Sequence, residues 1–293
     1  MILWWLAFIT ILVLVIKFQA RMLVRYTEQE DCGKEGVGPT EMARTRVVIV
    51  GLLRDGASTL PRIQKQVEQV GRQFLDYHVL IVENDSSDDT REKLLEWHRR
   101  NPRVDILGCG VNAPSCQINL PRTEGHPIEQ SRMAKMAYLR NLYLEHLRQH
   151  HSDFDYVLVW DLDLEARLTG LASSFDFFRS HPKAEAVCAY GYFPSSAGPI
   201  YFDTFAHEDD VPYDHRAHRQ HSLRTRYKHR YGCTDPVAVK SCFGGLTIYR
   251  TTALLPHNYE VAPEPTCEHT LLHRHLNQIF LNPRMRLAIA NNP

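Results

Sequence analysis

An apolar run that ends in two closely spaced carboxylates constrains the fold of this chain more than any other feature. Residues 156–160 are YVLVW, and Asp161 and Asp163 follow, separated by one residue. Such a run is typical of a buried strand, which delivers its last residues to the sheet edge where open α/β folds bind ligands. Two carboxylates at this spacing can bind a hard divalent cation, which in turn can neutralise a diphosphate. The pattern therefore indicates a site for a phosphorylated substrate.

The sequence before this run alternates between strand-like and helix-like segments. Short runs rich in Val, Ile and Leu predict buried strands, and apolar residues at helical spacing predict the helices between them. Alternation of this kind predicts a mostly parallel, doubly wound α/β sheet flanked by helices. The predicted strands are 46–51, 77–82 and 104–107, and the predicted helices are 60–74, 91–100 and 127–148.

Composition narrows the class of protein. The 293 residues, 44% of them apolar, suit one large domain with a sizeable core. Lys plus Arg and Asp plus Glu number 34 each, so no global field favours nucleic acid as a partner. The seven cysteines form no C-x-x-C pair, which argues against a zinc ribbon and a disulfide scaffold but leaves one or two disulfides open.

The N-terminus predicts a membrane anchor. Residues 2–16 carry no charge, and Lys17, Arg21 and Arg25 follow them. We expect 1–25 to be a transmembrane signal anchor and 26–45 a stem; a cleaved signal peptide is less favoured because no basic region precedes the apolar run. By the positive-inside rule, the basic residues after the anchor favour a body on the cytosolic face.

Further acidic residues follow the second predicted strand. Glu83 and Asp85 come at its end, so they are expected at the same sheet edge as Asp161 and Asp163. We place Glu83 and Asp85 near a nucleoside, and the later pair near ribose and metal. The alternative is that Asp161 and Asp163 merely end a strand at the surface.

The ordered set of these motifs resembles the GT-A class of glycosyltransferases, and within it the fungal capsule-associated mannosyltransferase family. The resemblance covers about residues 46–290. It implies one catalytic domain, 46–293, in which 46–165 would form the nucleotide-sugar half and 166–293 the acceptor half. Each motif alone is weak, and the order makes the set specific. The motifs are 51–55, 82–90, 139–141, 160–163, 202–206, 239–245, 267–269 and 282–288.

The resemblance implies transfer of a sugar, with mannose expected, from a GDP- or UDP-linked donor to a glycan or other hydroxyl acceptor. It implies Mn²⁺ or Mg²⁺ on the diphosphate, with Asp163 as a direct ligand. Asp161 would contact the donor ribose or sugar and orient the metal. The remaining residues expected on the donor are Asp55, Glu83, Asp85 and Arg140.

Catalysis and acceptor binding require further groups. Glu268 is the candidate base for an acceptor hydroxyl, and the alternative is a glutamate that only favours a helix start. His269 and His273 are spaced as a zinc pair but lack an evident third ligand, so we expect at most that His269 completes the manganese site. Asp203 among aromatic residues, and the Gly244 and Gly245 turn, are candidate acceptor contacts; a core strand and a plain turn are the alternatives.

Two other functions stay open at this stage. An apolar strand ending in Asp-x-Asp also describes a haloacid-type phosphatase with an aspartyl nucleophile, although that motif usually opens the first strand of its domain. A catalytically inactive anchored scaffold of the same fold is the non-enzyme alternative. The resemblance favours the secretory-pathway (Golgi-like) lumen for the body, against the cytosolic face that the flanking charges favour.

Overall fold

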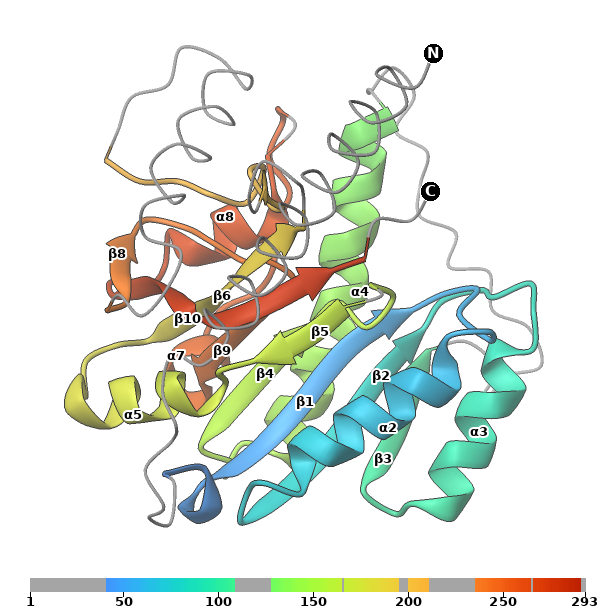
Figure 1. Cartoon of the computed structure of the whole chain (residues 1–293). Coiled ribbons are helices and arrows are strands. Elements are labelled where there is room, and N and C mark those ends of the chain that lie inside the picture. Colours follow the sequence, from blue (N-terminus) through green and yellow to red (C-terminus); the bar gives the residue numbers. More distant parts are fainter. Residues whose placement is uncertain are drawn as a thin grey trace, which may run out of the picture.

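The computed structural model describes residues 41–108, 128–164, 166–194, 200–210, 235–264 and 266–290, which form one ten-stranded sheet between two layers of helices (Figure 1). The strands are β1 (Arg46–Leu53), β2 (Asp76–Glu83), β3 (Val104–Gly108), β4 (Tyr156–Trp160), β5 (Ala166–Thr169), β6 (Ala186–Phe193), β7 (Ile200–Tyr201), β8 (Val237–Val239), β9 (Leu246–Arg250) and β10 (Ile279–Ile289). The helices are η1 (Glu41–Arg44), α2 (Leu60–Gly71), α3 (Thr90–Arg100), α4 (Ile128–His150), α5 (Ala172–Ser180), α7 (Thr251–Leu254) and α8 (Glu268–His273).

The first half of the sheet is parallel, as its strand and helix pattern predicts. The strand order is β3-β2-β1-β4-β9-β6-β10-β5, and β1 pairs in parallel with both β2 and β4. Alternate residues of β1 are buried on opposite faces: Val47 and Ile49 pack with α2 and α3, whereas Val48 and Val50 pack with α4. Burial on both faces explains why this strand is a continuous apolar run.

The second half is mixed, so the prediction of a mostly parallel sheet holds only in part. β9 is antiparallel to β4 and β6, β10 is parallel to β6, and β5 is antiparallel to β10. The chain enters β9 through Gly244 and Gly245 at the edge where the parallel strands end, so β9 must run in the opposite direction. The ladder of β10 shifts register between Asn282 and Arg286, where Pro283 offers no backbone N–H.

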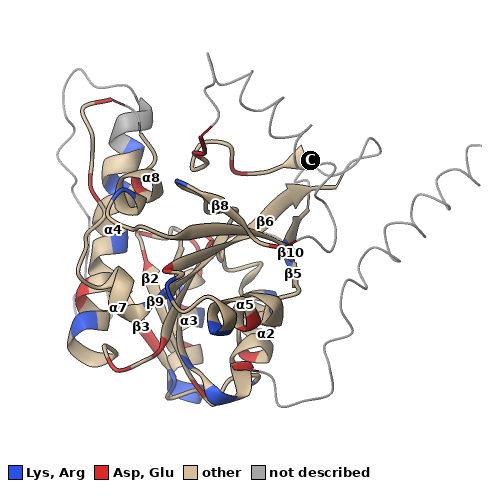
Figure 2. Ribbon diagram, turned by 90° about the vertical axis from the view of Figure 1, so that its left-hand side faces the viewer, with Lys and Arg blue, Asp and Glu red and all other residues tan. Residues whose placement is uncertain are grey.

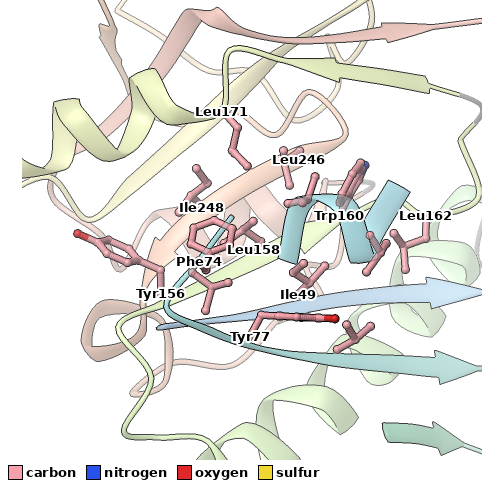
Figure 3. Close-up of a cluster of buried hydrophobic side chains, with 14 of the residues drawn as sticks. Ile49, Phe74, Tyr77, Tyr156, Leu158, Trp160, Leu162, Leu171, Leu246 and Ile248 are labelled. Atoms are coloured by element: carbon pink, nitrogen blue, oxygen red, sulfur yellow. The ribbon is translucent and has the colours of Figure 1, made fainter. Parts of the chain in front are cut away.

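The larger hydrophobic core lies beneath α2, α3 and α5 (Figure 3). Ile49, Leu158 and Ile248 extend into it from three neighbouring strands and are fully buried. Phe74 meets Phe175 of α5 edge to face, with ring centroids 5.1 Å apart. This core fixes β1, β4 and β9 side by side and so fixes the sheet edge where β4 ends.

The predicted anchor, 1–25, and most of the predicted stem, 26–45, lie outside the described residues. At the end of the stem, Met42 in η1 is buried in the core of the body. Within the described ranges, no helix has the length and apolar content needed to span a membrane.

Charge is distributed as the balanced composition predicts. Basic and acidic residues are interspersed along the described helices (Figure 2). Such an arrangement is typical of a solvated surface.

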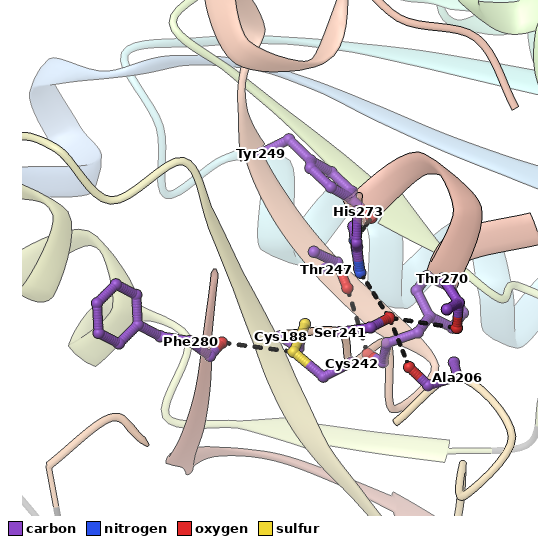
Figure 4. Close-up of a disulfide and its surroundings, with 10 residues drawn as sticks. Cys188, Ala206, Ser241, Cys242, Thr247, Tyr249, Thr270, His273 and Phe280 are labelled. Atoms are coloured by element: carbon purple, nitrogen blue, oxygen red, sulfur yellow. Dashed lines mark hydrogen bonds between the residues drawn. A yellow bond between two sulfur atoms is a disulfide. The ribbon is translucent and has the colours of Figure 1, made fainter. Parts of the chain in front are cut away.

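A disulfide joins a strand of the mixed half to the segment that leads into β9. Cys188 of β6 is bonded to Cys242, which precedes β9 (Figure 4). The sequence left the existence of such a bridge open and indicated no pairing. Cys267 is a buried free thiol.

Loss of this disulfide is expected to lower the free energy of unfolding by about 2–4 kcal/mol, because the bond closes a loop of 54 residues and restricts the unfolded chain. Urea unfolding of the oxidised protein and of a Cys188→Ala/Cys242→Ala variant measures the difference. Reductant should destabilise the wild type alone. Equal sensitivity of both proteins to reductant would contradict the assignment.

Candidate active site

A buried arginine lies at the centre of the site. Arg140 projects from α4, and its Nε donates to Glu268 Oε1 at 3.1 Å while its Nη2 donates to Asp161 Oδ1 at 3.3 Å. The guanidinium lies over the rings of Phe243 and Tyr259, at 5.4 and 5.7 Å from their centroids. Only 3% of the Arg140 side chain is exposed. One cation of α4 therefore links the residue after β4 to the start of α8, and Glu268 lies 128 residues after Arg140 in the sequence.

The site carries an excess of carboxylates. Burial raises the pKa of Asp161 to about 7; Arg140 opposes this shift, and the nearby Asp163 and Asp203 add to it. Burial likewise raises the pKa of Asp203 to about 6, with a further contribution from Glu268. Asp163 itself is exposed. A group of carboxylates that repel one another in this way favours binding of an additional cation.

His269 faces the same pocket as a neutral imidazole. Its ring stacks on Phe243 with centroids 3.8 Å apart, and its Nε2 lies 3.9 Å from Glu268 Oε1. Burial holds the pKa of His269 well below its ordinary value, and Arg140 and His273 reinforce the shift. Both ring nitrogens are buried without a hydrogen bond from the described part of the chain.

Two glycines bring these groups together. Gly244 and Gly245 have φ of 63° and 83°, a conformation that favours glycine. A Cβ on Gly244 would lie 2.1 Å from the Ala189 carbonyl oxygen, so backbone packing alone requires glycine there. The Gly245 carbonyl accepts the Asp161 N–H at 2.9 Å. The turn therefore positions Asp161. That Gly244 and Gly245 contact the acceptor stays a prediction.

The loops after β1 and β2 form a connected pair. Asp55 and Asp85 both have φ of 49°. Asp55 Oδ1 accepts from the backbone N–H and hydroxyl of Ser87, which hold the pKa of Asp55 below its ordinary value. Glu83 is buried, and its oxygens accept from Ser86 N–H and Arg91 Nε. Glu83 thus orders the loop that carries Asp85.

The predicted site residues separate into two neighbouring groups. A cavity of about 370 Å³ collects Arg140, Asp161, Asp203, Glu268 and His269. Asp55, Glu83 and Asp85 lie at the ends of β1 and β2. Two strand spacings separate β4 from β2, so the groups lie about 10 Å apart along one sheet edge.

The carboxylates fit Mn²⁺ or Mg²⁺ only with help from a substrate. Asp161 and Asp163 offer oxygen ligands beside several unneutralised carboxylates. However, Asp161, Asp163 and His269 do not bring three ligand atoms within 4.8 Å of one another; of the described residues, only His78, Asp105 and His151 do so. Since such ions are commonly bound by one or two carboxylates plus substrate phosphates, the site fits a metal that binds together with a diphosphate.

Several residues at the site were not predicted as site residues. Arg132, Met133, Met136 and Phe243 line the cavity. Tyr259 is held through its backbone by both side-chain amide atoms of Asn141. These contacts join segments about 118 residues apart, so helical spacing in α4 shows only that one of its faces is buried.

A buried histidine behind the site predicts a pH dependence of stability. His273 lies between the hydroxyls of Ser241 and Tyr249, at 2.9 and 2.7 Å (Figure 4). Ser241 donates its proton to the Ala206 carbonyl, so the neutral imidazole donates to Ser241 and accepts from Tyr249. Burial lowers the pKa of His273 to about 3.

In the unfolded chain this histidine has its ordinary pKa, near 6.5. Between that pH and about 3, the unfolded state binds a proton that the folded state excludes, so stability falls as the pH falls. Relative to His273→Gln, we expect the wild type to lose about 1.4 kcal/mol more for each pH unit in this window. Urea unfolding at pH 7, 6, 5 and 4 tests this, and parallel curves for the two proteins would contradict it.

Structural comparison bears on the fold. GalNAc-T7 with UDP, GalNAc and Mn²⁺ matches 85% of the chain and 44% of its own length, at 15% identity and a TM-score of 0.51. The mannosyltransferase PcManGT of Pyrobaculum calidifontis with GDP-Man and Mn²⁺ is 15% identical, with a TM-score of 0.48, and the match covers 94% of this chain and 66% of PcManGT. TarS of S. aureus is 15% identical, with a TM-score of 0.45, and the match covers 84% of this chain and 60% of TarS. The chain spans 44 to 66% of these proteins. The fold is that of a glycosyltransferase.

Sequence comparison gives the family. The model of the family described as cryptococcal mannosyltransferase 1 matches residues 46–278. The chain therefore belongs to this glycosyltransferase family, which confirms the predicted resemblance and disfavours the haloacid-type phosphatase. None of the curated proteins compared with the chain matches it.

Proposed function

We propose that this protein transfers mannose from GDP-mannose to a hydroxyl of a glycan acceptor, in a reaction that depends on Mn²⁺ or Mg²⁺. The observation that carries the proposal is the cavity in which Arg140 lies between Asp161 and Glu268, at the carboxyl edge of the sheet. Membership of a mannosyltransferase family supports mannose as the sugar. Guanine as the base of the donor is part of the proposal.

The donor would lie along the sheet edge. Asp85 and Asp55, on the loops that Glu83 orders, would contact the nucleoside, and Arg140 would face the phosphates or the sugar. Asp163 and Asp161 would hold the metal together with the donor diphosphate. When bound, the metal neutralises charge that develops on the leaving diphosphate. Because the residues on both sides of Arg140 are already paired with it, the cavity is organised before the donor arrives.

The acceptor would enter the cavity from the side opposite the nucleoside. Glu268 Oε1 is bound by Arg140, whereas Oε2 has a weak contact with the Cys267 thiol at 3.8 Å. Oε2 is therefore placed to accept the proton of an acceptor hydroxyl as the hydroxyl oxygen bonds to C1 of the sugar. Asp203 and the ring of Phe202, which line the same cavity, would contact the acceptor sugar.

We also propose that 1–25 anchors the protein with its body in the lumen of the secretory pathway. The apolar residues 2–16 support the anchor, and the Cys188–Cys242 disulfide supports the luminal side, because such bonds persist in oxidising compartments. Protease protection of the body in sealed microsomes tests this. Digestion of the body without detergent would contradict it.

Nucleoside diphosphate binding tests the proposed donor. We expect calorimetry with Mn²⁺ to show tight binding of GDP, weaker binding of UDP and ADP, and loss of binding with chelator. GMP is the matched control, because it keeps the base and lacks the second phosphate. Tighter binding of UDP than of GDP would mean that the donor carries uracil in place of guanine. No binding of any nucleoside diphosphate to folded protein would favour the inactive scaffold.

A further inference from the structure

A second polar cluster lies around Asp105, away from the proposed active site. Asp105 Oδ2 is 2.8 Å from His78 Nε2, 3.5 Å from His146 Nε2 and 3.9 Å from His151 Nε2. His98 Nδ1 lies 3.9 Å from the other carboxylate oxygen. The histidines come from β2, α3, α4 and the turn after α4, so four segments converge on one carboxylate.

The cluster is at the opposite edge of the sheet. His78 and Asp105 are near the first residues of β2 and β3, whereas the proposed active site lies where the parallel strands end. His151 follows the last residue of α4, about 16 Å along that helix from Arg140 at 1.5 Å per residue. A group bound here would not touch the donor.

The spacing of the ligand atoms matches a small metal ion. One ligand atom from each of His78, Asp105 and His151 lies within 4.8 Å of the others. Zinc bonds to imidazole nitrogen and carboxylate oxygen are about 2.0–2.2 Å long, so ligand atoms on a zinc tetrahedron lie about 3.4 Å apart. The distances from Asp105 Oδ2 to the Nε2 atoms of His78 and His151 are 2.8 and 3.9 Å, one shorter and one longer than this spacing.

We propose that His78, Asp105 and His151 form a structural site for a divalent transition metal such as Zn²⁺. Imidazole with one carboxylate is a ligand set that suits zinc better than magnesium or calcium. The metal would tie the end of α4 to β2 and β3.

The protonation and bonding of the histidines agree with this assignment. The Nε2 atoms of His146 and His151 are buried and make no hydrogen bond with the described residues. Burial lowers the pKa of His151 to about 4 and also lowers that of His146, so both rings are neutral near pH 7. Neutral imidazole is the form that binds a metal.

Zinc binding by the full-length protein in detergent tests the site. After removal of metals by chelator, Zn²⁺ affinity is measured against a chromophoric competitor. We expect the His151→Gln variant to bind zinc at least about 100-fold more weakly than the wild type, since loss of an outer contact alone costs 10- to 100-fold. The His181→Gln variant, which removes a histidine of the α5 end, should match the wild type.

The Asp163→Asn variant separates this site from the proposed catalytic metal. It should keep the high-affinity zinc, because Asp163 lies at the other edge of the sheet. Loss of that zinc in Asp163→Asn, or equal affinity in His151→Gln and the wild type, would overturn the proposal. Neither result depends on enzyme activity, so failure of the proposed function would leave this test intact.

Two measurements on the wild type guard against misfolding of the His151→Gln variant. Saturating Zn²⁺ should raise the Tm by about 5 °C or more. Co²⁺ in its place should give the intense visible absorption of tetrahedral coordination, also in Asp163→Asn. The absence of both effects in the wild type would overturn the site.

Discussion

Replacing Asp163 by asparagine is expected to lower kcat/KM for the nucleotide-sugar donor about 100- to 1000-fold. The amide keeps the shape of the side chain and removes the negative charge that would hold the metal on the diphosphate. Because Asp163 is exposed, the Tm should change by less than about 2 °C. The Mn²⁺ concentration for half-maximal activity should rise, which a purely structural role would not cause.

The Asp176→Asn variant is the matched control. Asp176 is an exposed aspartate of α5 that forms an ion pair with Arg179 of the same helix, and its loss should leave activity unchanged. Initial rates of donor cleavage over a Mn²⁺ series measure both variants. Full Mn²⁺-dependent activity in Asp163→Asn would show that the metal is held elsewhere.

Replacing Arg140 by methionine is expected to lower the free energy of unfolding by about 3–5 kcal/mol, the typical result of removing one partner of a buried ion pair. The substitution leaves Glu268 and Asp161 without their shared cation. Donor cleavage should also be lost. Arg140→Lys should be intermediate, because an ammonium cannot hold both carboxylates in the fixed geometry of a guanidinium.

The pH dependence distinguishes this mechanism from a simple loss of packing. Without Arg140, the pKa of Asp161 should rise above its present value of about 7, so protonation relieves the repulsion at low pH. The loss of stability should therefore be smaller at pH 5.5 than at pH 8. Arg72→Met, which removes an exposed i,i+4 pair with Glu68, should cost less than about 0.5 kcal/mol at both values. A pH-independent loss in Arg140→Met would contradict the electrostatic explanation.

The parallel half of the fold follows from local sequence patterns. β1 and β2 are buried on both faces along most of their length, so each contains an apolar run that the sequence shows directly, whereas β3 buries alternate residues. The observed bounds of α2 and β2 differ from the predicted ones by three residues or fewer. Ser86 lies shortly before α3 but does not cap it, because its hydroxyl oxygen accepts from the Asp55 N–H.

The mixed half could not be predicted in this way. β10 contains Pro283 and two arginines within its ladder, which interrupt any simple alternation. The Cys188–Cys242 bond depends on β6 lying beside β9, and seven cysteines allow many other pairings. Long-range register of this kind is a property of packing and has no local signature.

For the candidate site, the sequence indicated the residue types and the sheet edge but not the partners. Asp161 and Asp163 follow an apolar run, so their position was predictable. The bridge from Arg140 to Glu268 joins segments 128 residues apart, and no spacing rule connects them. The Asp105 cluster was missed for the same reason, since its histidines are scattered over four segments.

Cleavage of GDP-mannose in oxygen-18 water is the most direct test of sugar transfer. The full-length protein is incubated with Mn²⁺ and no acceptor, so that water takes the acceptor's place, and the products are identified by mass spectrometry. We predict GDP without label and mannose carrying one labelled oxygen, because the bond between C1 and the leaving phosphate oxygen breaks. Label in a phosphate product, or no metal-dependent release of GDP by folded protein, would contradict the proposed function.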